Sequence, residues 1–305
     1  VTLTQYPVQT GAGFDAIIDL IKMVMYKFPA GGGKPQKLPI PAEELDNANR
    51  LHNELVEKAA ENDENLMALY FEKGNLEEVE LREGIKIGMM KHQVFPVFCL
   101  SGKKDMGSGR LMGFIDNVAP SAVDMPAEIL EDGTEVKCDP AAPARLFVFK
   151  TLVEPHLGKL TLFKVMSGEV TPGMEFFNEK TNTTERIGQI FILDGKNRNQ
   201  VETLKAGDIA ATLKLKNTQT CHTLNAKGAT GNIDPIHFPE PKVRTAIVAQ
   251  KKSDDEKLGE VMAEIHAEDP TIVIQYDREL KQMLLMAQGD LHLQVTKWRL
   301  SHLYK

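Results

Sequence analysis

Glycine-rich segments are the first residues whose types and spacing could do chemistry, because the backbone amides of such loops can cradle phosphate groups. Gly31-Gly-Gly-Lys34 has the glycine and lysine of a P-loop, but Pro35 replaces the magnesium-binding Ser or Thr and Phe28 replaces the first glycine. Gly11-Ala-Gly13 fits part of a dinucleotide-binding fingerprint, but no βαβ pattern follows it and no acidic residue stands about 20 residues further on. We therefore interpret the first segment as a loop and the second as a turn.

The eight histidines and three cysteines do not have the spacing of a metal site. There is no HExxH motif, and Cys99, Cys138 and Cys221 are widely separated without a CxxC pair. An odd number of distant cysteines also argues against a disulfide framework and predicts reduced thiols. No GxSxG motif places a serine on a nucleophile elbow. From the residues alone we expect no metal and no catalytic group.

Residues 41–91 are expected to form helices, because apolar residues recur there at helical spacing with charges between them. The positions concerned include Leu51, Leu55, Ala59, Leu66, Leu69 and Tyr70. Residues 93–100 are a short apolar run typical of a buried strand, followed by a polar loop at 101–109 and a helix-like pattern at 110–118. This strand, loop and helix order is typical of an α/β sheet.

The pattern changes in the middle of the chain. Residues 119–144 contain four prolines and several acidic residues without periodicity, which predicts an interdomain linker. Residues 145–224 are short runs rich in β-branched and aromatic residues, separated by Gly and Pro turn signals. Short strands at this spacing predict a β-barrel.

Residues 243–305 predict the order βαββα, with strands at 243–249, 272–276 and 280–287. The first helix should bury a face that carries Leu258, Val261, Met262 and Ile265, and the last helix a face that carries Leu291, Val295 and Trp298. A ferredoxin-like domain needs one more strand. The expected fold class is therefore multidomain: an α/β part, an all-β part and a truncated ferredoxin-like α+β part.

The net charge of −7 is uneven along the chain. Residues 1–140 carry −9, residues 141–240 carry +2 and residues 241–305 carry 0. A protein that binds bare nucleic acid normally has a basic surplus, so this balance argues against an autonomous DNA-binding protein. It leaves open a large RNA–protein surface contacted by a few local cations. No apolar run approaches the ~20 residues of a membrane span, so we expect a cytoplasmic protein with no membrane partner.

Several segments, in collinear order along essentially all 305 residues, resemble bacterial elongation factor G, a family of translational GTPases. In the first part these are residues 96–107 (PVFCLSGKKDMG), 14–23 (FDAIIDLIKM) and 55–67 (LVEKAAENDENLM). Further along they include residues 158–163 (GKLTLF), 206–211 (AGDIAA), 268–271 (EDPT) and 289–293 (GDLHL).

The resemblance implies a division into domains. Residues 1–123 would be the C-terminal part of a G domain with its helical insert, 124–144 a linker, 145–238 the β-barrel domain II, and 239–305 a ferredoxin-like domain III that lacks its last strand. The family's Walker A motif, switch regions and NKxD motif would lie upstream of Val1, and further domains beyond Lys305. We therefore expect that residues 1–305 are not an enzyme and hold no cofactor, whereas the full-length family uses GTP and Mg²⁺.

The resemblance also implies a function and its residues. The family binds the ribosome, through ribosomal RNA and small-subunit proteins, and promotes movement of tRNA and mRNA during protein synthesis. Partners within the same protein would be the G-domain core and the C-terminal domains. Ser101, Gly102 and Lys103 would form the guanine-binding loop. Ribosome or interdomain contacts would come from Lys196, Arg198, Thr220, Thr223, Asp269, Pro270, Gly289 and His292.

Three segments differ from the family pattern: residues 192–200 (ILDGKNRNQ), 220–224 (TCHTL) and 286–292 (MAQGDLH). These differences predict a diverged paralogue rather than the main elongation factor. Two alternatives remain open at this point. One is a noncatalytic ribosome-associated binding protein, and the other is a GTPase of the ribosomal protection or release-factor type.

Overall fold

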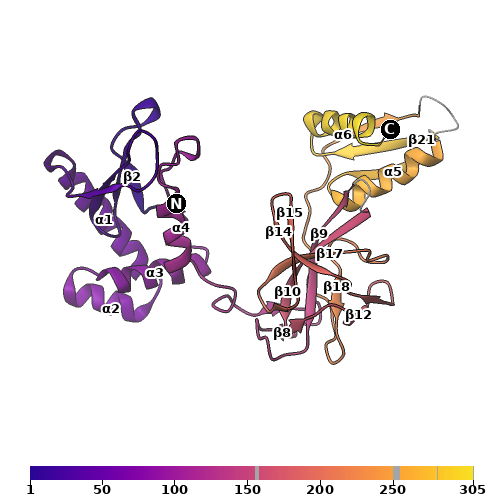
Figure 1. Ribbon diagram of the computed structural model, residues 1–305, viewed down its shortest axis with the longest axis horizontal. Helices are drawn as coiled ribbons and strands as arrows, with labels where there is room; N and C mark the ends of the chain where they lie inside the picture. Colours follow the sequence, from indigo (N-terminus) through magenta and orange to yellow (C-terminus); the bar gives the residue numbers. More distant parts are fainter. Residues whose placement is uncertain (155–157, 250–254, 280, 305) are drawn as a thin grey trace. The chain divides into compact units, whose positions relative to one another are not determined.

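The computed structural model describes residues 1–154, 158–249, 255–279 and 281–304. The chain forms two compact units, Val1–Pro126 and Ala127–Lys305 (Figure 1). The first unit holds 13 basic and 18 acidic residues, a net charge of −5, and the second holds 23 basic and 25 acidic residues, a net charge of −2. The expected fold class, with α/β, all-β and α+β parts, is confirmed.

The first unit contains a four-stranded antiparallel sheet whose strands follow the order of the chain. The strands are β2 (Gln5–Pro7), β3 (Ala16–Asp19), β4 (Val24–Lys27) and β5 (Gln36–Leu38). The short 3-10 helix η1 (Gly11–Gly13) connects β2 to β3, at the turn expected from the sequence. Every residue of β3 is buried, because Ile18 packs against the helices and Ile17 against Tyr26 and Phe28 on the other face.

The predicted helical segment forms three helices, α1 (Ala42–Ala60), α2 (Glu64–Lys73) and α3 (Glu78–Met90). Leu55 and Ala59 of α1 are buried, as their spacing predicts. The Asp63 carboxylate caps α2 by accepting from the backbone N–H groups of Asn65 and Leu66. Among the described residues, no helix combines the length and apolar character that a bilayer-spanning segment needs.

The strand expected at residues 93–100 is much shorter than predicted. Only β6 (Pro96–Val97) is extended, and it pairs in parallel with the two-residue strand β1 (Thr2–Leu3). The apolar run is not continuously buried, since Phe95 is 55% exposed. The short 3-10 helix η2 (Gly102–Lys104) and helix α4 (Ser108–Asn117) follow, so the predicted strand, loop and helix order is confirmed.

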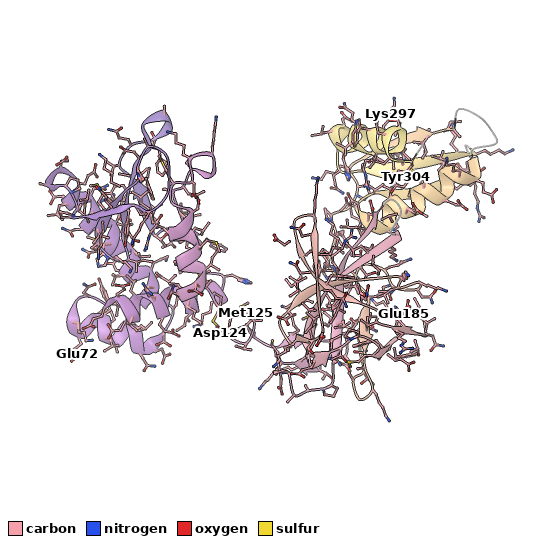
Figure 2. The ribbon with its side chains drawn as sticks, viewed as in Figure 1. Glu72, Asp124, Met125, Glu185, Lys297 and Tyr304 are labelled. Carbon is pink, nitrogen blue, oxygen red and sulfur yellow. The ribbon has the colours of Figure 1, made fainter. Side chains whose placement is uncertain are left out.

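Asp124, labelled in Figure 2, fastens the end of the first unit to helix α3. Its carboxylate accepts from the N–H and hydroxyl of Ser121 at 2.8 and 2.7 Å, and Lys86 Nζ of α3 lies 3.0 Å away. These hydrogen bonds, followed by the Lys86 ammonium, lower the pKa of Asp124 to about 2. The residue at which the linker was predicted to begin is therefore held in the first unit.

From Ala127 onward, the stretch predicted as a linker at 124–144 belongs to the second unit. Strands β7 (Glu128–Ile129) and β8 (Glu135–Val136) pair, and Leu130 and Val136 are buried against Met166 and Ile233. These apolar contacts place the stretch on the barrel.

Backbone contacts hold the end of this stretch in place. The Gly168 N–H donates to the Asp139 carbonyl at 2.8 Å, and the Ser167 hydroxyl donates to the Pro143 carbonyl at 2.8 Å. A Cβ on Gly168, whose φ is +78°, would lie 2.4 Å from Ala144 Cα, so this approach requires glycine. Residues 127–140 contain five acidic residues and one basic residue. Because this stretch belongs to the same compact unit as the barrel, it adds negative charge beside the barrel.

The barrel is an eight-stranded antiparallel sheet in the order β13-β12-β18-β9-β10-β17-β14-β15. Its strands are β9 (Arg145–Glu154), β10 (Gly158–Ser167), β12 (Glu175–Asn178), β13 (Thr183–Arg186), β14 (Ile190–Asp194), β15 (Asn197–Val201), β17 (Ile209–Leu213) and β18 (Thr223–Asn225). A separate pair is formed by β11 (Glu169–Val170) and β16 (Leu204–Lys205). One hydrophobic core fills the inside of the barrel, and its residues Leu146, Val148, Phe163 and Val165 are completely buried.

The C-terminal domain has the predicted βαββα order. Its elements are β19 (Val243–Ile247), α5 (Asp255–Glu268), β20 (Val273–Asp277), β21 (Gln282–Ala287) and α6 (Asp290–His302). The sheet order is β19-β21-β20, all antiparallel. Met262 and Ile265 of α5 are completely buried, as predicted. Leu280, where the third strand was expected to begin, lies outside the described residues.

The prediction for the buried face of α6 was wrong. Leu291, Val295 and Trp298 are 73%, 45% and 54% exposed. The helix packs instead through Leu293 and Leu300, which lie against the core of α5 and the sheet. Apolar residues occur on both sides of this helix at helical spacing, so periodicity could not choose between the two faces.

Candidate functional site

The barrel and the C-terminal domain meet where strand β9 extends beyond its neighbour. Strand β18 pairs with β9 only from Arg145 to Phe147, so within the described part of the chain no strand lies beside the last residues of β9 on that side. The C-terminal end of helix α5 packs there. An unpaired strand edge and the unpaired carbonyls of a helix end therefore come together, and each needs hydrogen-bond partners.

Two barrel threonines cap the end of α5. Thr151 Oγ1 donates to the Ala267 carbonyl at 2.6 Å, and Thr220 Oγ1 donates to the same carbonyl at 3.3 Å. The two hydroxyl oxygens lie 3.3 Å apart. This carbonyl belongs to the last turn of α5 and has no partner within the helix, so the hydroxyls supply it.

Glu268, the last residue of α5, ties three elements together. Its Oε1 accepts from the Val153 N–H of β9 at 2.5 Å, and its Oε2 accepts from Arg299 Nη2 of α6. The Glu268 side chain is only 6% exposed, so both the backbone donor and the guanidinium compensate for a buried carboxylate. One side chain thus joins the barrel to both helices of the C-terminal domain.

Asp269 lies next to this carboxylate and joins α6 by a second contact. Its Oδ1 accepts from the Thr271 hydroxyl at 2.6 Å and the Thr271 N–H at 3.0 Å, and its Oδ2 lies 3.1 Å from His292 Nε2. On the other side of the ring, the Gln288 N–H lies 3.4 Å from His292 Nδ1. Although burial opposes it, the hydrogen bonds from Thr271 and the contact with His292 lower the pKa of Asp269.

A cavity of about 500 Å³ opens at this junction. It is lined by Phe149 and Thr220 of the barrel and by Asp269, Pro270 and Arg299 of the C-terminal domain. We call this set of contacts and its cavity the II–III junction. Three of the predicted contact residues, Thr220, Asp269 and Pro270, therefore come together in the fold.

Two more predicted contact residues reach the same place through helix α6. Gly289 stands just before the first residue of α6, and its carbonyl accepts from the Leu293 N–H at 3.1 Å. His292 lies in the first turn and contacts Asp269. The segment at residues 286–292 that differs from the family pattern thus lies beside the II–III junction.

The remaining predicted contact residues lie elsewhere. Lys196 is exposed in the tight turn between β14 and β15, after Gly195 with a φ of +56°, and Arg198 follows on β15. This basic hairpin lies at the edge of the barrel sheet. Thr223, in contrast, is completely buried, and its Oγ1 accepts from the Ile233 N–H at 2.9 Å. Its side chain holds a loop of the barrel and does not reach a surface.

The predicted guanine-binding loop is a compact turn after β6. The Ser101 N–H donates to the Met106 carbonyl at 2.8 Å, so this donor is used within the loop. A Cβ on Gly102 would meet no atom within 4 Å, which leaves space beside the backbone of that residue. Lys103 lies in η2 and is exposed. The sequence supplies no phosphate cradle beside this loop, and the guanine contact stays a prediction.

The glycine segment considered as a P-loop packs against that turn. Gly32 has a φ of +78°, and a Cβ there would lie 2.3 Å from the Lys104 carbonyl oxygen. The Gly33 N–H also donates to the Asp105 carbonyl at 3.4 Å. The segment is therefore a turn fixed by close backbone packing, which explains its glycines without a phosphate.

Sequence reasoning missed three residues that make the II–III junction: Thr151, Glu268 and Arg299. Thr151 is one of many threonines in barrel strands, and nothing in its spacing marks it. Glu268 begins the segment at 268–271, so the motif pointed to the right place. Among the described residues, no group of three or more His, Cys, Asp or Glu side chains is arranged to hold a metal ion.

Two family descriptions match the second unit, one after the other. Residues 143–227 match "Elongation factor G domain 2", and residues 238–305 match "Elongation Factor G, domain III". The chain belongs to the elongation factor G family. Residues 143–227 are its domain II, residues 238–305 are its domain III, and the II–III junction lies between these two domains of the family.

The whole chain is also similar in fold to a solved structure, a crystal structure of a protein from Thermus thermophilus. The TM-score is 0.81 and the sequence identity is 24%, over 98% of this chain and 43% of that protein. The similarity includes the first unit, for which it shows the fold. The chain spans less than half the length of that relative.

Proposed function

We propose that this protein acts on the ribosome as an elongation factor G-like translational GTPase, promoting movement of tRNA and mRNA in the cytoplasm. The observation that supports this most directly is the succession of domains II and III in family order, joined through Thr151, Thr220 and Glu268. Domains held together in this way can move as one body when a G domain changes state. GTP and Mg²⁺ would serve the full-length protein.

Residues 1–305 by themselves should neither bind GTP appreciably nor hydrolyse it. The sequence contains no GxxxxGK[ST] and no NKxD motif, and the phosphates with their Mg²⁺ contribute most of the affinity in such proteins. The loop at Ser101–Lys103 would contact only the guanine. Calorimetry with GTP and Mg²⁺ should give no binding heat, and a micromolar dissociation constant would contradict this part of the proposal.

Ribosome contact should run through local cations rather than through overall charge. The second unit carries −2, and the acidic residues 127–140 lie on the barrel itself. The β14–β15 hairpin carries the exposed Lys196 in its turn and the half-buried Arg198 two residues further on, in β15. Phosphate groups of ribosomal RNA are the chemistry that such a hairpin would contact.

The test is co-sedimentation with small ribosomal subunits at increasing salt. The chain should bind, and binding should weaken as salt rises, because counterions compete for the same phosphates. The double variant Lys196→Glu with Arg198→Glu should bind at least about tenfold more weakly at low salt. The matched control, Lys205→Glu with Lys216→Glu, makes the same change of charge at exposed barrel positions outside the hairpin and should bind like the parent.

Equal binding by the parent and the hairpin variant would remove the hairpin from the interface. No binding by the parent chain at any salt would contradict ribosome contact through domains II and III. A noncatalytic ribosome-associated binding protein would give the same sedimentation result. Stimulated GTP hydrolysis on ribosomes by the full-length protein distinguishes the GTPase from that alternative.

A further inference from the structure

The first unit contains a cavity of about 310 Å³ between α3, α4 and the turn that follows β3. Its apolar wall is formed by Phe98, Phe114 and Val118. Its polar wall includes Gln5, Asn117, the Asp19 carboxylate and the three cations Lys22, Arg82 and Arg110. The volume is at the small end of the range for ligand pockets. Three cations around one cavity stand out in a unit whose net charge is −5.

The contacts of Arg110 use only part of its capacity to donate hydrogen bonds. Its Nη2 donates to Asp19 Oδ2 at 3.0 Å, and its guanidinium lies 4.3 Å above the Tyr26 ring. The other Asp19 oxygen accepts from the N–H groups of Ile21 and Lys22 at 3.1 and 3.0 Å. The Asp19 carboxylate is thus already engaged by three donors.

Arg82 and Lys22 share a single carboxylate. Arg82 Nη2 donates to Glu78 Oε1 at 2.5 Å, and Lys22 Nζ lies 3.6 Å from the same oxygen. Asp19 and Glu78 therefore face three cations, which leaves a surplus of one positive charge around the cavity. A low-dielectric, partly aromatic wall strengthens the pull of that surplus on an anion.

Two buried hydrogen-bond donors also indicate that the cavity suits an anion. Among the described residues, the Nε atoms of Arg82 and Arg110 are buried and have no hydrogen-bond partner. Both arginines line this cavity. A buried guanidinium N–H without an acceptor is unfavourable, and a small shift of either arginine toward a carboxylate or phosphate in the cavity would give its Nε–H a charge-assisted hydrogen bond.

We propose that this cavity binds a small organic anion, in which a carboxylate or phosphate group is attached to an apolar, aromatic-sized body. The anionic head would lie against Lys22, Arg82 and Arg110, and the body would pack on Phe98 and Phe114. The site lies outside the II–III junction and the guanine-binding loop. It therefore stands independently of the proposed ribosome function.

The test uses phenyl phosphate and benzoate as probes, with inorganic phosphate and phenol as the separate halves of the ligand. In the full chain with ¹⁵N-labelled arginine, both aryl anions should shift the Nε–H signals of Arg82 and Arg110 saturably below about 1 mM. Phenol should leave them unchanged, and inorganic phosphate should bind more weakly than the aryl anions. The Arg50 signal should not move.

A matched pair of variants tests the role of Arg82. Arg82→Gln should weaken aryl-anion binding about tenfold, because a charge-assisted hydrogen bond is lost. Arg50→Gln removes an equivalent contact, since Arg50 donates to Glu54 at 2.5 Å with the same four-residue spacing on α1, and it should bind like the parent. The Arg110 Nε–H signal checks that the cavity keeps its structure in both variants.

The proposal fails if neither Nε–H signal moves on addition of an aryl anion. It also fails if phenol produces the same shifts as benzoate, if inorganic phosphate binds as tightly as phenyl phosphate, or if Arg82→Gln binds as tightly as Arg50→Gln.

Discussion

Asp19–Arg110 in the first unit and Glu268–Arg299 in the second are the same kind of contact in two different settings. The carboxylate side chains are 4% and 6% exposed, and the arginine side chains are 27% and 24% exposed. Asp19 receives its other hydrogen bonds from its own turn, whereas Glu268 receives one from Val153, 115 residues away in the barrel. The first pair stabilises one domain, and the second joins domain II to domain III.

The largest effect is expected from Arg110→Met. It leaves the buried Asp19 carboxylate without its cation and should destabilise the first unit by about 3–5 kcal/mol. Hydrogen exchange should show faster opening of β3 and α4, while the amides of β9 in the second unit keep their protection. Arg50→Met, at an exposed ion pair, should cost less than about 0.5 kcal/mol. A large loss in both variants would mean that burial of the carboxylate is not the cause.

A smaller loss is expected from Arg299→Met, about 2–3 kcal/mol, because it removes the ion pair with Glu268, whereas Arg110→Met removes an ion pair and also the contact of Arg110 with the Tyr26 ring. Protection of the Val153 amide should fall together with that of α6, since one carboxylate serves both. Lys297→Met, at an exposed position on the same helix, is the control and should change neither. If α6 loosens while Val153 stays protected, Glu268 does not couple the two domains.

The threonine caps can be tested by a cross-strand pair. Thr151→Val removes the 2.6 Å hydrogen bond to Ala267 and should cost about 1 kcal/mol. Thr161 is opposite Thr151 in the sheet, and its buried hydroxyl has no partner among the described residues. Thr161→Val should therefore be neutral or stabilising in thermal unfolding. Equal destabilisation by both variants would show that the cap is not what Thr151 contributes.

The smallest effect concerns acid. Because the pKa of Asp269 is lowered in the fold, its contribution is complete above the unfolded value of about 3.9 and is lost as pH falls through the folded value. Asp269→Asn should flatten the decline in stability of the second unit between about pH 5 and 2, by less than about 1 kcal/mol given the exposure of the site.

Fluorescence of Trp298, the single tryptophan, reports the unfolding of α6 in this experiment. Asp124, whose pKa is also lowered, lies in the first unit, so its protonation does not contribute to this signal. The pKa of His222 is also lowered, chiefly by burial. Protonation of His222 affects the stability of the parent and of Asp269→Asn alike, so it cancels when their pH profiles are subtracted. Identical pH profiles for the parent and Asp269→Asn would contradict the prediction.

Much of the fold was predictable from the sequence, because the signals are local. Leu55 and Ala59 repeat at helical spacing on α1, and Gly74 ends α2 in the left-handed conformation that glycine favours.

The length of the strand at residues 93–100 was overestimated, because an apolar run does not reveal the length of its partner strand, which is the two-residue β1. Residues 127–144 were interpreted as a linker because their few apolar residues form no periodic pattern. Leu130 and Val136 nevertheless suffice to attach them to the barrel.

The candidate site was predictable only where a motif marks it. The segments at 268–271 and 289–293 pointed to Asp269 and His292, which do meet, at 3.1 Å. Thr223 carried the same kind of motif signal but is buried, because a motif does not distinguish a surface contact from a loop anchor. Thr151 and Arg299 had no signal at all.

The sequence by itself determined the order of the domains, the positions of most helices and strands, and the family, since these depend on short motifs and on periodicities of 3.6 and 2 residues. Only the tertiary structure decided which face of α6 is buried, where residues 127–144 pack, and which arginine meets each buried carboxylate. The physical reason is that these choices depend on free energies of contact between residues far apart in the chain, such as Val153 and Glu268. Both faces of α6 satisfy the local pattern equally, and the neighbours that α5 and the sheet provide select one of them.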